Sequence, residues 1–299
     1  GNHTQLFRAF AKLRRDFPNI ATVVGGPHPT YFPEECSHHA DFVVMSEGFG
    51  SFRRILRGEA EPGIMPMTKV ERFPLPDRKT FYEIYPEHAR SKIKSFISMT
   101  GCPYSCTYCY NSSGPEDIQA PKEIVDAVKD GVALTVLGQA ERTMGMGRRL
   151  FPFNVRSVDD VIAEAREVAE KWPTEIFYCQ DDVHGFDLNN WMPAMAARWM
   201  AEVGIPYHAQ MRWEMTKDKK RLDLLQQAGC SGLTLAIEAA DQTIRKEVLD
   251  REMPEELMFK GMSALKRRGF KIRTEQITAL PYGATSTPTS RPSKTAFVT

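Results

Sequence analysis

Apolar positions in the first 60 residues alternate between helical spacing and short continuous runs. Residues 4–16 repeat apolar side chains at helical intervals up to Pro18, and short helices are predicted over residues 33–38 and 49–56. The runs 20–24 and 41–45 are apolar on both faces, as buried parallel strands are. This αβαβ order is typical of an open, doubly wound sheet.

Two strands leave the faces of such a sheet largely unburied. We therefore expect residues 1–58 to be the C-terminal remnant of a Rossmann-like domain whose front part lies upstream. Five prolines then follow within residues 59–92, namely Pro62, Pro66, Pro74, Pro76 and Pro86. Because proline fixes φ and removes a backbone donor, this stretch is predicted to be an extended linker.

Beyond residue 92, short apolar strands again alternate with helical patterns. Strands are predicted over residues 93–99, 175–179, 207–211, 233–237 and 271–280, and helices over 191–203, 219–228 and 241–268. The repeated β–α order predicts an α/β fold, a parallel sheet curled into a partial (β/α) barrel over residues 93–283. Residues 284–299 are rich in Thr, Ser and Pro, so we expect a disordered tail.

Charge and composition narrow the choice of partners. Lys plus Arg number 39 and Asp plus Glu 38, so a formal charge of +1 gives no indication of a polybasic nucleic-acid surface. The apolar runs are too short for a membrane span. The chain begins with Gly1 and shows no signal peptide, so we expect it to begin inside a longer protein. Three of its six cysteines lie within eight positions, which indicates metal ligation in a reducing, cytoplasmic setting.

Residues 101–109 carry the strongest chemical signal. Cys102, Cys106 and Cys109 are spaced Cys-x3-Cys-x2-Cys, so three thiolates can hold three irons of a cubane and leave the fourth open. A zinc site would need a fourth ligand, and no second cysteine pair follows nearby. A redox pair of Cys106 and Cys109 would leave Cys102 unexplained. The other cysteines, Cys36, Cys179 and Cys230, are predicted to be buried small hydrophobes.

This loop resembles that of radical S-adenosylmethionine (SAM) enzymes, which carry an aromatic residue just before the last cysteine, here Tyr108. The resemblance runs from about residue 20 to residue 285, through residues 153–162, 179–182, 228–239 and 280–285. It implies a [4Fe–4S] cluster on the three cysteines and SAM as the second cofactor. The cluster would cleave SAM reductively and so start radical chemistry on a substrate.

In barrel enzymes the carboxyl ends of strands carry the function, so the loop, Asp181, Asp182, Arg212 and Glu238 are expected to converge there. The resemblance implies that Asp181 accepts a hydrogen bond from the SAM ammonium and that Glu238 binds a ribose hydroxyl. Arg212 or Arg251 would hold the SAM carboxylate. Ordinary surface ion pairing is the alternative for each.

Residues 24–30 and 45–48 resemble the end of a cobalamin-binding domain, with Gly25 and Gly26 allowing close approach of the backbone to a ligand. The sequence has no Asp-x-His-x-x-Gly segment of the kind that holds the lower face of cobalt, and Ser46 and Phe49 depart from the usual Gly-Glu-Gly-Glu run. We therefore expect this chain to bind cobalamin weakly or not at all by itself.

The resemblance implies an enzyme that acts on a small-molecule or peptide substrate and takes electrons from a ferredoxin or flavodoxin. Cobalamin-dependent methyl transfer is the leading reaction, and ring formation or rearrangement is the next. Two alternatives stay open, a cluster-bearing binding or electron-transfer protein and an inactive truncated fragment. Residues 113–150 match no pattern.

Overall fold

The computed structural model of the chain describes residues 2–65, 73–104, 106–126, 128, 149–151, 153–278 and 280. Two compact units divide them. The first holds the described residues up to 73 and those between 101 and 153, and the second holds residues 74–100 and those from 154 onward. The cysteine loop therefore groups with the N-terminal unit, whereas the sequence analysis assigned it to the barrel.

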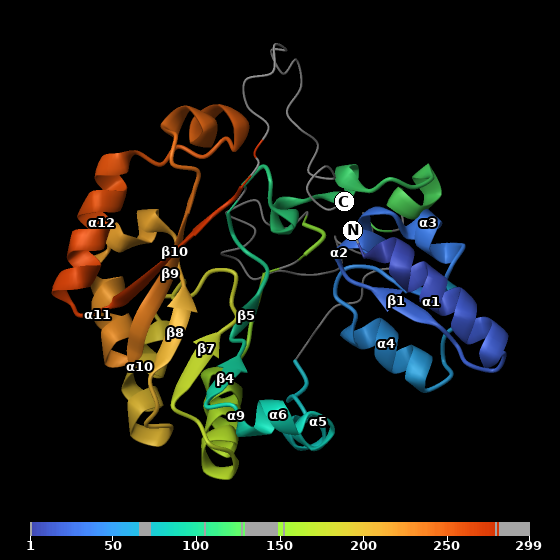
Figure 1. Cartoon of the computed structure of the whole chain (residues 1–299), viewed down its shortest axis with the longest axis horizontal. Coiled ribbons are helices and arrows are strands. Elements are labelled where there is room, and N and C mark those ends of the chain that lie inside the picture. The colour runs from blue at the N-terminus through green and yellow to red at the C-terminus, as the bar shows by residue number, and fades with distance from the viewer. Residues whose placement is uncertain are drawn as a thin grey trace. The chain divides into compact units, whose positions relative to one another are not determined.

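The N-terminal unit is built on a three-stranded parallel sheet in the order β1-β2-β3 (Figure 1). Its elements are α1 (His3–Asp16), β1 (Val23–Gly25), α2 (Pro27–Tyr31), α3 (Pro33–Ser37), β2 (Phe42–Val44), α4 (Phe49–Leu56) and β3 (Gly63–Met65), followed by the 3₁₀ turns Tyr110–Ser112 and Pro115–Asp117. The predicted helices and the first two strands are confirmed. The third strand, β3, lies in the stretch that was expected to be linker.

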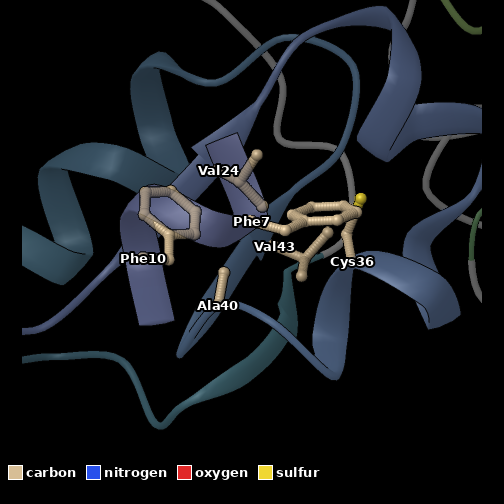
Figure 2. Close-up of a cluster of buried hydrophobic side chains, with 6 residues drawn as sticks. All are labelled: Phe7, Phe10, Val24, Cys36, Ala40 and Val43. Carbon is tan, nitrogen blue, oxygen red and sulfur yellow. The ribbon is translucent and has the colours of Figure 1, made fainter. Parts of the chain in front are cut away.

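Three small cores among the described residues stabilise this unit, the third of them formed by Phe42, Val44 and Met65. In the first, Phe7 and Phe10 of α1 pack on Val24 and Val43 of the sheet, with Cys36 and Ala40 beside them (Figure 2). The second gathers residues that are distant in sequence, namely Tyr31, Met45, Ile118, Val128 and Leu150. Because Ile118 and Leu150 come from the segment after the cysteine loop, the described part of that segment belongs to the N-terminal unit.

The second unit carries a five-stranded, wholly parallel sheet in the order β10-β9-β8-β7-β4. Its elements are α5 (Arg78–Ile84), α6 (Pro86–Arg90), β4 (Ile93–Phe96), β5 (Met99–Thr100), β6 (Asn154–Val155), α9 (Val158–Lys171), β7 (Ile176–Cys179), α10 (Trp191–Glu202), β8 (Tyr207–Gln210), a 3₁₀ helix (Trp213–Lys217), α11 (Lys219–Gln227), β9 (Cys230–Glu238), a π-helical turn (Ile244–Val248), α12 (Glu255–Arg267) and β10 (Lys271–Gln276).

Helices α9, α10, α11 and α12 cover one face of this sheet (Figure 1). The core between them centres on Trp199 of α10, whose ring lies 4.9 Å from that of Phe96, 5.5 Å from Phe177 and 5.3 Å from Tyr207. Cys179 and Cys230 are buried in this unit and Cys36 in the first, as predicted. With helices on one face, the sheet is a partial barrel, and the predicted fold class is confirmed.

The predicted linker is wrong in part, because residues 78–90 form α5 and α6. Asp77 caps α5 by accepting a hydrogen bond from the Thr80 amide, and Pro86 occupies the first turn of α6, where a missing N–H costs nothing. The predicted strand 93–99 is also interrupted, since β5 leaves the main sheet and pairs antiparallel with β6. The predicted tail, residues 284–299, and all of residues 129–148 lie outside the described residues. No helix among the described residues is long and apolar enough to cross a membrane.

A buried carboxylate joins α5 to α9 and β4 within the second unit, which we call the barrel unit. Glu164 of α9 accepts from Arg78 Nε at 2.9 Å and from Arg156 Nη1 at 2.6 Å. The same two arginines donate to the carbonyls of Ser95 in the edge strand β4 and of Ile97 just after it. The side chains of Glu164 and Arg156 are each only 3% exposed. One carboxylate therefore balances two guanidinium groups that fix the strand.

We expect Glu164→Ala to lower the free energy of unfolding by about 3–5 kcal/mol, because it leaves buried guanidinium charge uncompensated. All four tryptophans lie in the barrel unit, so urea denaturation followed by tryptophan fluorescence measures the effect. Glu167→Ala on the same helix removes only the exposed pair with Lys171 and serves as the control, with a change below about 1 kcal/mol. Equal effects of the two substitutions would contradict this account.

Candidate active site

Cys102, Cys106 and Cys109 are half-buried and lie on a loop whose described residues form no helix or strand. The Cys109 amide donates to the Cys106 carbonyl at 3.2 Å, which closes a turn around the half-buried Tyr108. The hydroxyl of Ser112 lies 2.6 Å from the Cys106 carbonyl and 2.8 Å from the Cys109 carbonyl. The loop thus presents three thiols on an ordered backbone, as a metal site requires.

Sequence reasoning missed one side chain of this loop region. Arg149 donates hydrogen bonds to carbonyls of the cysteine loop, including those of Pro103 and Tyr104. It ends a glycine-rich run that resembles no known motif, and its partners lie some 45 residues earlier in the chain. No local pattern could have indicated the contact.

Asp181 lies two residues after the end of β7 and is fully buried. Its carboxylate accepts from the backbone amides of Ser98 and Met99 at 2.6 and 3.0 Å, from the Ser98 hydroxyl, and from His184 Nδ1 at 2.7 Å. Burial by itself raises the pKa of Asp181, but the His184 and Ser98 bonds outweigh it and hold the pKa below its ordinary value. Asp181 therefore remains ionised and fixes the backbone that leads into the cysteine loop.

The neighbouring acid behaves differently, because consecutive residues of an extended chain point to opposite sides. Asp182 is exposed to solvent. The structure thus separates the two predicted acids, one turned into the protein and one on its surface. Both predicted contacts with a cofactor stay predictions.

Three predicted site residues meet at the carboxyl ends of β8 and β9. Arg251 pairs with Glu238 and reaches Glu214 Oε2 at 4.0 Å. Arg212 binds both oxygens of Glu214, at 2.7 and 3.3 Å. Burial opposes ionisation of Glu214, but Arg212, with a contribution from Arg251, lowers its pKa below the ordinary value. These four side chains form a network of alternating charge, Arg212–Glu214–Arg251–Glu238, at one end of the sheet.

The backbone at Glu238 is strained. Its φ is +67°, in the left-handed region that a side chain other than glycine seldom occupies, and the pairing of β9 with β10 shifts register at the same point. Such strain gathers at functional sites and bulges re-aim side chains beside them. Glu214 completes this network and was missed by the sequence analysis, although its spacing two residues after Arg212 is a usable signal.

The face of the sheet not covered by helices is polar. Ring stacking joins Tyr178 to His208 at 5.1 Å, and His208 Nε2 lies 2.7 Å from the Thr234 hydroxyl. Burial, with the nearby charge of Arg273, lowers the pKa of His208, so its imidazole is neutral near pH 7. Residues of this face line a cavity of about 400 Å³, among them Ser95, Tyr178, Gln180, Gln210, Arg273 and Glu275. Such a lining suits a polar ligand.

In the N-terminal unit, the predicted glycines lie where β1 ends. A Cβ on Gly25 would lie 3.4 Å from the Val44 carbonyl oxygen, and Gly26 has a φ of +104°. Beside them is a cavity of about 420 Å³ lined by Val23, Gly25, Val44, Glu47, Gly48, Phe49 and Phe52. It opens at the carboxyl ends of β1 and β2, the edge where open α/β sheets bind ligands.

Comparison with known proteins shows which proteins this chain resembles. Cytidylyl-2-hydroxyethylphosphonate methyltransferase from Streptomyces wedmorensis is 26% identical over 263 residues, which cover 79% of this chain and 48% of the relative. The chain thus spans about half the length of that relative.

Among solved structures, the radical SAM methyltransferase TsrM from Kitasatospora setae, with cobalamin and a [4Fe–4S] cluster bound, superimposes with a TM-score of 0.60 at 13% identity. The match covers 92% of this chain and 54% of TsrM, so it includes the N-terminal sheet as well as the partial barrel. At this identity the likeness establishes the fold.

A family match links that fold to the cysteine loop. Residues 96–285, from the end of β4 through the loop and the rest of the barrel unit, match the radical SAM superfamily. This range is more than half of the 299 residues and contains Cys102, Cys106 and Cys109. The chain therefore belongs to the radical SAM superfamily.

Proposed function

We propose that this chain forms the catalytic part of a cobalamin-dependent radical SAM methyltransferase. The observation that carries the proposal is the loop of three half-buried thiols, ordered by Ser112 and Arg149, in a radical SAM chain. The methyltransferase relative and the likeness to TsrM favour methyl transfer over ring formation or rearrangement.

The donor set fits an iron–sulfur cubane. Cys102, Cys106 and Cys109 supply three thiolates, and soft thiolates are the ligands that iron–sulfur clusters take. Cys102, Cys106 and Cys109 would hold three irons of such a cluster, and the group would supply, when reduced, the electron needed for reductive cleavage of SAM. An electron carrier normally uses four cysteines, so the three-thiol loop also argues against the electron-transfer alternative.

The charged network Arg212–Glu214–Arg251–Glu238, at the ends of β8 and β9, is the proposed SAM contact. SAM carries a ribose, a carboxylate and an ammonium, and Glu238 and the two arginines offer complementary groups. We assign Glu238 to a ribose hydroxyl and Arg212 or Arg251 to the carboxylate. The proposed bond of Asp181 to the ammonium would require it to release a present donor, since Ser98, Met99 and His184 already occupy both oxygens.

The apolar cavity beside Gly25 is the proposed cobalamin-facing surface. Glycine at the strand end admits a bulky ligand that a side chain would exclude, and Phe49 and Phe52 offer apolar contacts for it. This chain supplies three strands of the sheet, and a cofactor at the ends of a parallel sheet contacts several strands and loops. We therefore infer a partial site in this chain.

The polar face of the five-stranded sheet is the proposed substrate surface. The methyltransferase relative acts on a cytidylyl phosphonate, which is a highly polar molecule. The amides of Gln180 and Gln210, the Tyr178–His208 stack and Arg273 could bind such a substrate. A lipophilic substrate would leave these groups without hydrogen-bond partners, at a cost in affinity. A ferredoxin or flavodoxin remains the proposed electron donor.

Anaerobic reconstitution tests the central proposal. The chain is expected to bind about four irons and to show, after reduction, an EPR signal that changes when SAM is added. Cys106→Ala removes one ligand and is expected to lower the iron content, whereas Cys36→Ala, in the N-terminal core, is the matched control. Copurification of one zinc per chain without iron would refute the cluster assignment, and a SAM-insensitive signal would favour the electron-transfer alternative.

Glu238→Gln is expected to weaken SAM binding by roughly ten- to a hundredfold, since a charge-assisted hydrogen bond contributes about 1.5–3 kcal/mol. Iron content should not change, because Glu238 is not a proposed cluster ligand. Equilibrium dialysis of labelled SAM against the reconstituted chain measures the affinity, with the exposed neighbour Glu252→Gln as the control. Unaltered affinity would remove Glu238 from the SAM site.

Cobalamin binding by this chain is expected to be weak, because the described N-terminal sheet has three strands and a cofactor at the ends of a parallel sheet contacts several strands and loops. After incubation with hydroxocobalamin and desalting, the corrin absorbance should correspond to well under one cobalamin per chain. A titration without desalting should still show saturable binding. Retention of one cobalamin per chain after desalting would show that the three-stranded sheet is a complete site.

A further inference from the structure

Arg149 is nearly buried, with 8% of its surface exposed, and its guanidinium lies among the carbonyls of the cysteine loop. Nη1 donates to the carbonyls of Cys102, Tyr104 and Asn111, the latter two at 2.8 and 3.3 Å, and Nη2 donates to that of Pro103 at 3.2 Å. One side chain therefore joins the residues before the second cysteine to a residue beyond the third.

Together with Ser112, this arrangement satisfies the carbonyl of every proposed cluster ligand. Arg149 binds the Cys102 carbonyl, and the Ser112 hydroxyl is shared by those of Cys106 and Cys109. The carbonyls of Cys106 and Cys109 also accept from the backbone amides of Cys109 and Ser112, at 3.2 and 3.1 Å. An unsatisfied buried carbonyl is costly, so these bonds stabilise the loop. The backbone at all three thiols is thus fixed by two side chains.

The neighbourhood of Arg149 is also electrostatically suited to a negative group. Burial lowers the pKa of Arg149, while proximity to Cys102, Cys106 and Cys109 acts to raise it. The hydrogen bonds to the Cys102, Tyr104 and Asn111 carbonyls place the guanidinium against the loop that carries all three thiols. Negative charge on thiolates, or on a reduced cluster held by them, is stabilised by a fixed positive charge next to it.

We propose that Arg149 is a positioning residue for the cluster, which holds the loop in its ligand-binding form and favours the reduced state of the cluster by its charge. This inference rests on the proposed function of the loop. Groups around a metal site that orient its ligands commonly change metal affinity about 10- to 100-fold when removed. Hydrogen bonds and charge near a cluster also set its reduction potential.

Two substitutions separate the two roles. Lysine keeps the charge but lacks the planar fork that reaches several carbonyls at once, and methionine has neither. The full chain carrying Arg149→Lys or Arg149→Met is reconstituted with equal iron and sulfide. Iron loss to a chelator is then followed by absorbance, and the midpoint potential is measured by titration followed by EPR. Arg15→Met, an exposed arginine of α1, is the control.

Arg149→Met is expected to weaken iron retention about 10- to 100-fold and to shift the midpoint potential of the remaining cluster to a more negative value. Arg149→Lys should lose part of the retention but keep a potential near that of the unmodified chain. Arg15→Met should match the unmodified chain in both measurements. Circular dichroism before reconstitution shows whether each variant is folded.

Retention and potential that are unaltered in Arg149→Met would overturn the inference. Equal loss of iron in both variants with an unchanged potential would also overturn it, because the residue would then act only on folding of the loop. These results differ from failure of the proposed function, in which the unmodified chain itself would bind no cluster.

Discussion

The described backbone of the cysteine loop forms no helix or strand, so the position of its three thiols depends on hydrogen bonds from neighbouring side chains. Before the loop, the Asp181 carboxylate fixes the amides of Ser98 and Met99. Within it, Arg149 and Ser112 bind the carbonyls of the three cysteines. After it, the Tyr31 hydroxyl bonds to that of Ser113, and burial raises the pKa of Tyr31 to about 12, so it stays protonated.

In the barrel unit, ion pairs support a strained stretch of backbone. Glu238 stands in a left-handed conformation at the end of β9, which costs free energy and needs support from its surroundings. Its pair with the nearly buried Arg251 provides that support, and Glu214 links Arg251 to Arg212. A carboxylate and two guanidinium groups that already bind one another are oriented in advance, and this lowers the ordering cost of binding a charged ligand.

Elements whose pattern is local were predictable from sequence. Helix α4 begins at Phe49 and ends at Leu56, as its periodicity indicates, and the Cys-x3-Cys-x2-Cys spacing identified the proposed metal ligands. The main error also has a local cause, since prolines that were taken to exclude regular structure stand beside α5 and in the first turn of α6. The contacts of Arg149 and the pairing of Arg251 with Glu238 join residues that are distant in sequence or depend on a bulge, and no periodicity encodes them.

Asp181 and Asp182 show what the sequence alone does not predict about a site. Both acids follow a buried strand at the functional end of a parallel sheet, so position alone treats them alike. Alternation along the chain turns one inward and the other outward, and only the register of β7 against β4 and β8 decides which. The inward acid meets the Ser98 and Met99 amides and His184, all brought by other segments, and becomes a structural anchor. An acid at this strand end can thus have either of two roles. It can position the loop that binds a cofactor, or it can contact the cofactor itself, and a one-residue shift in strand register decides between them.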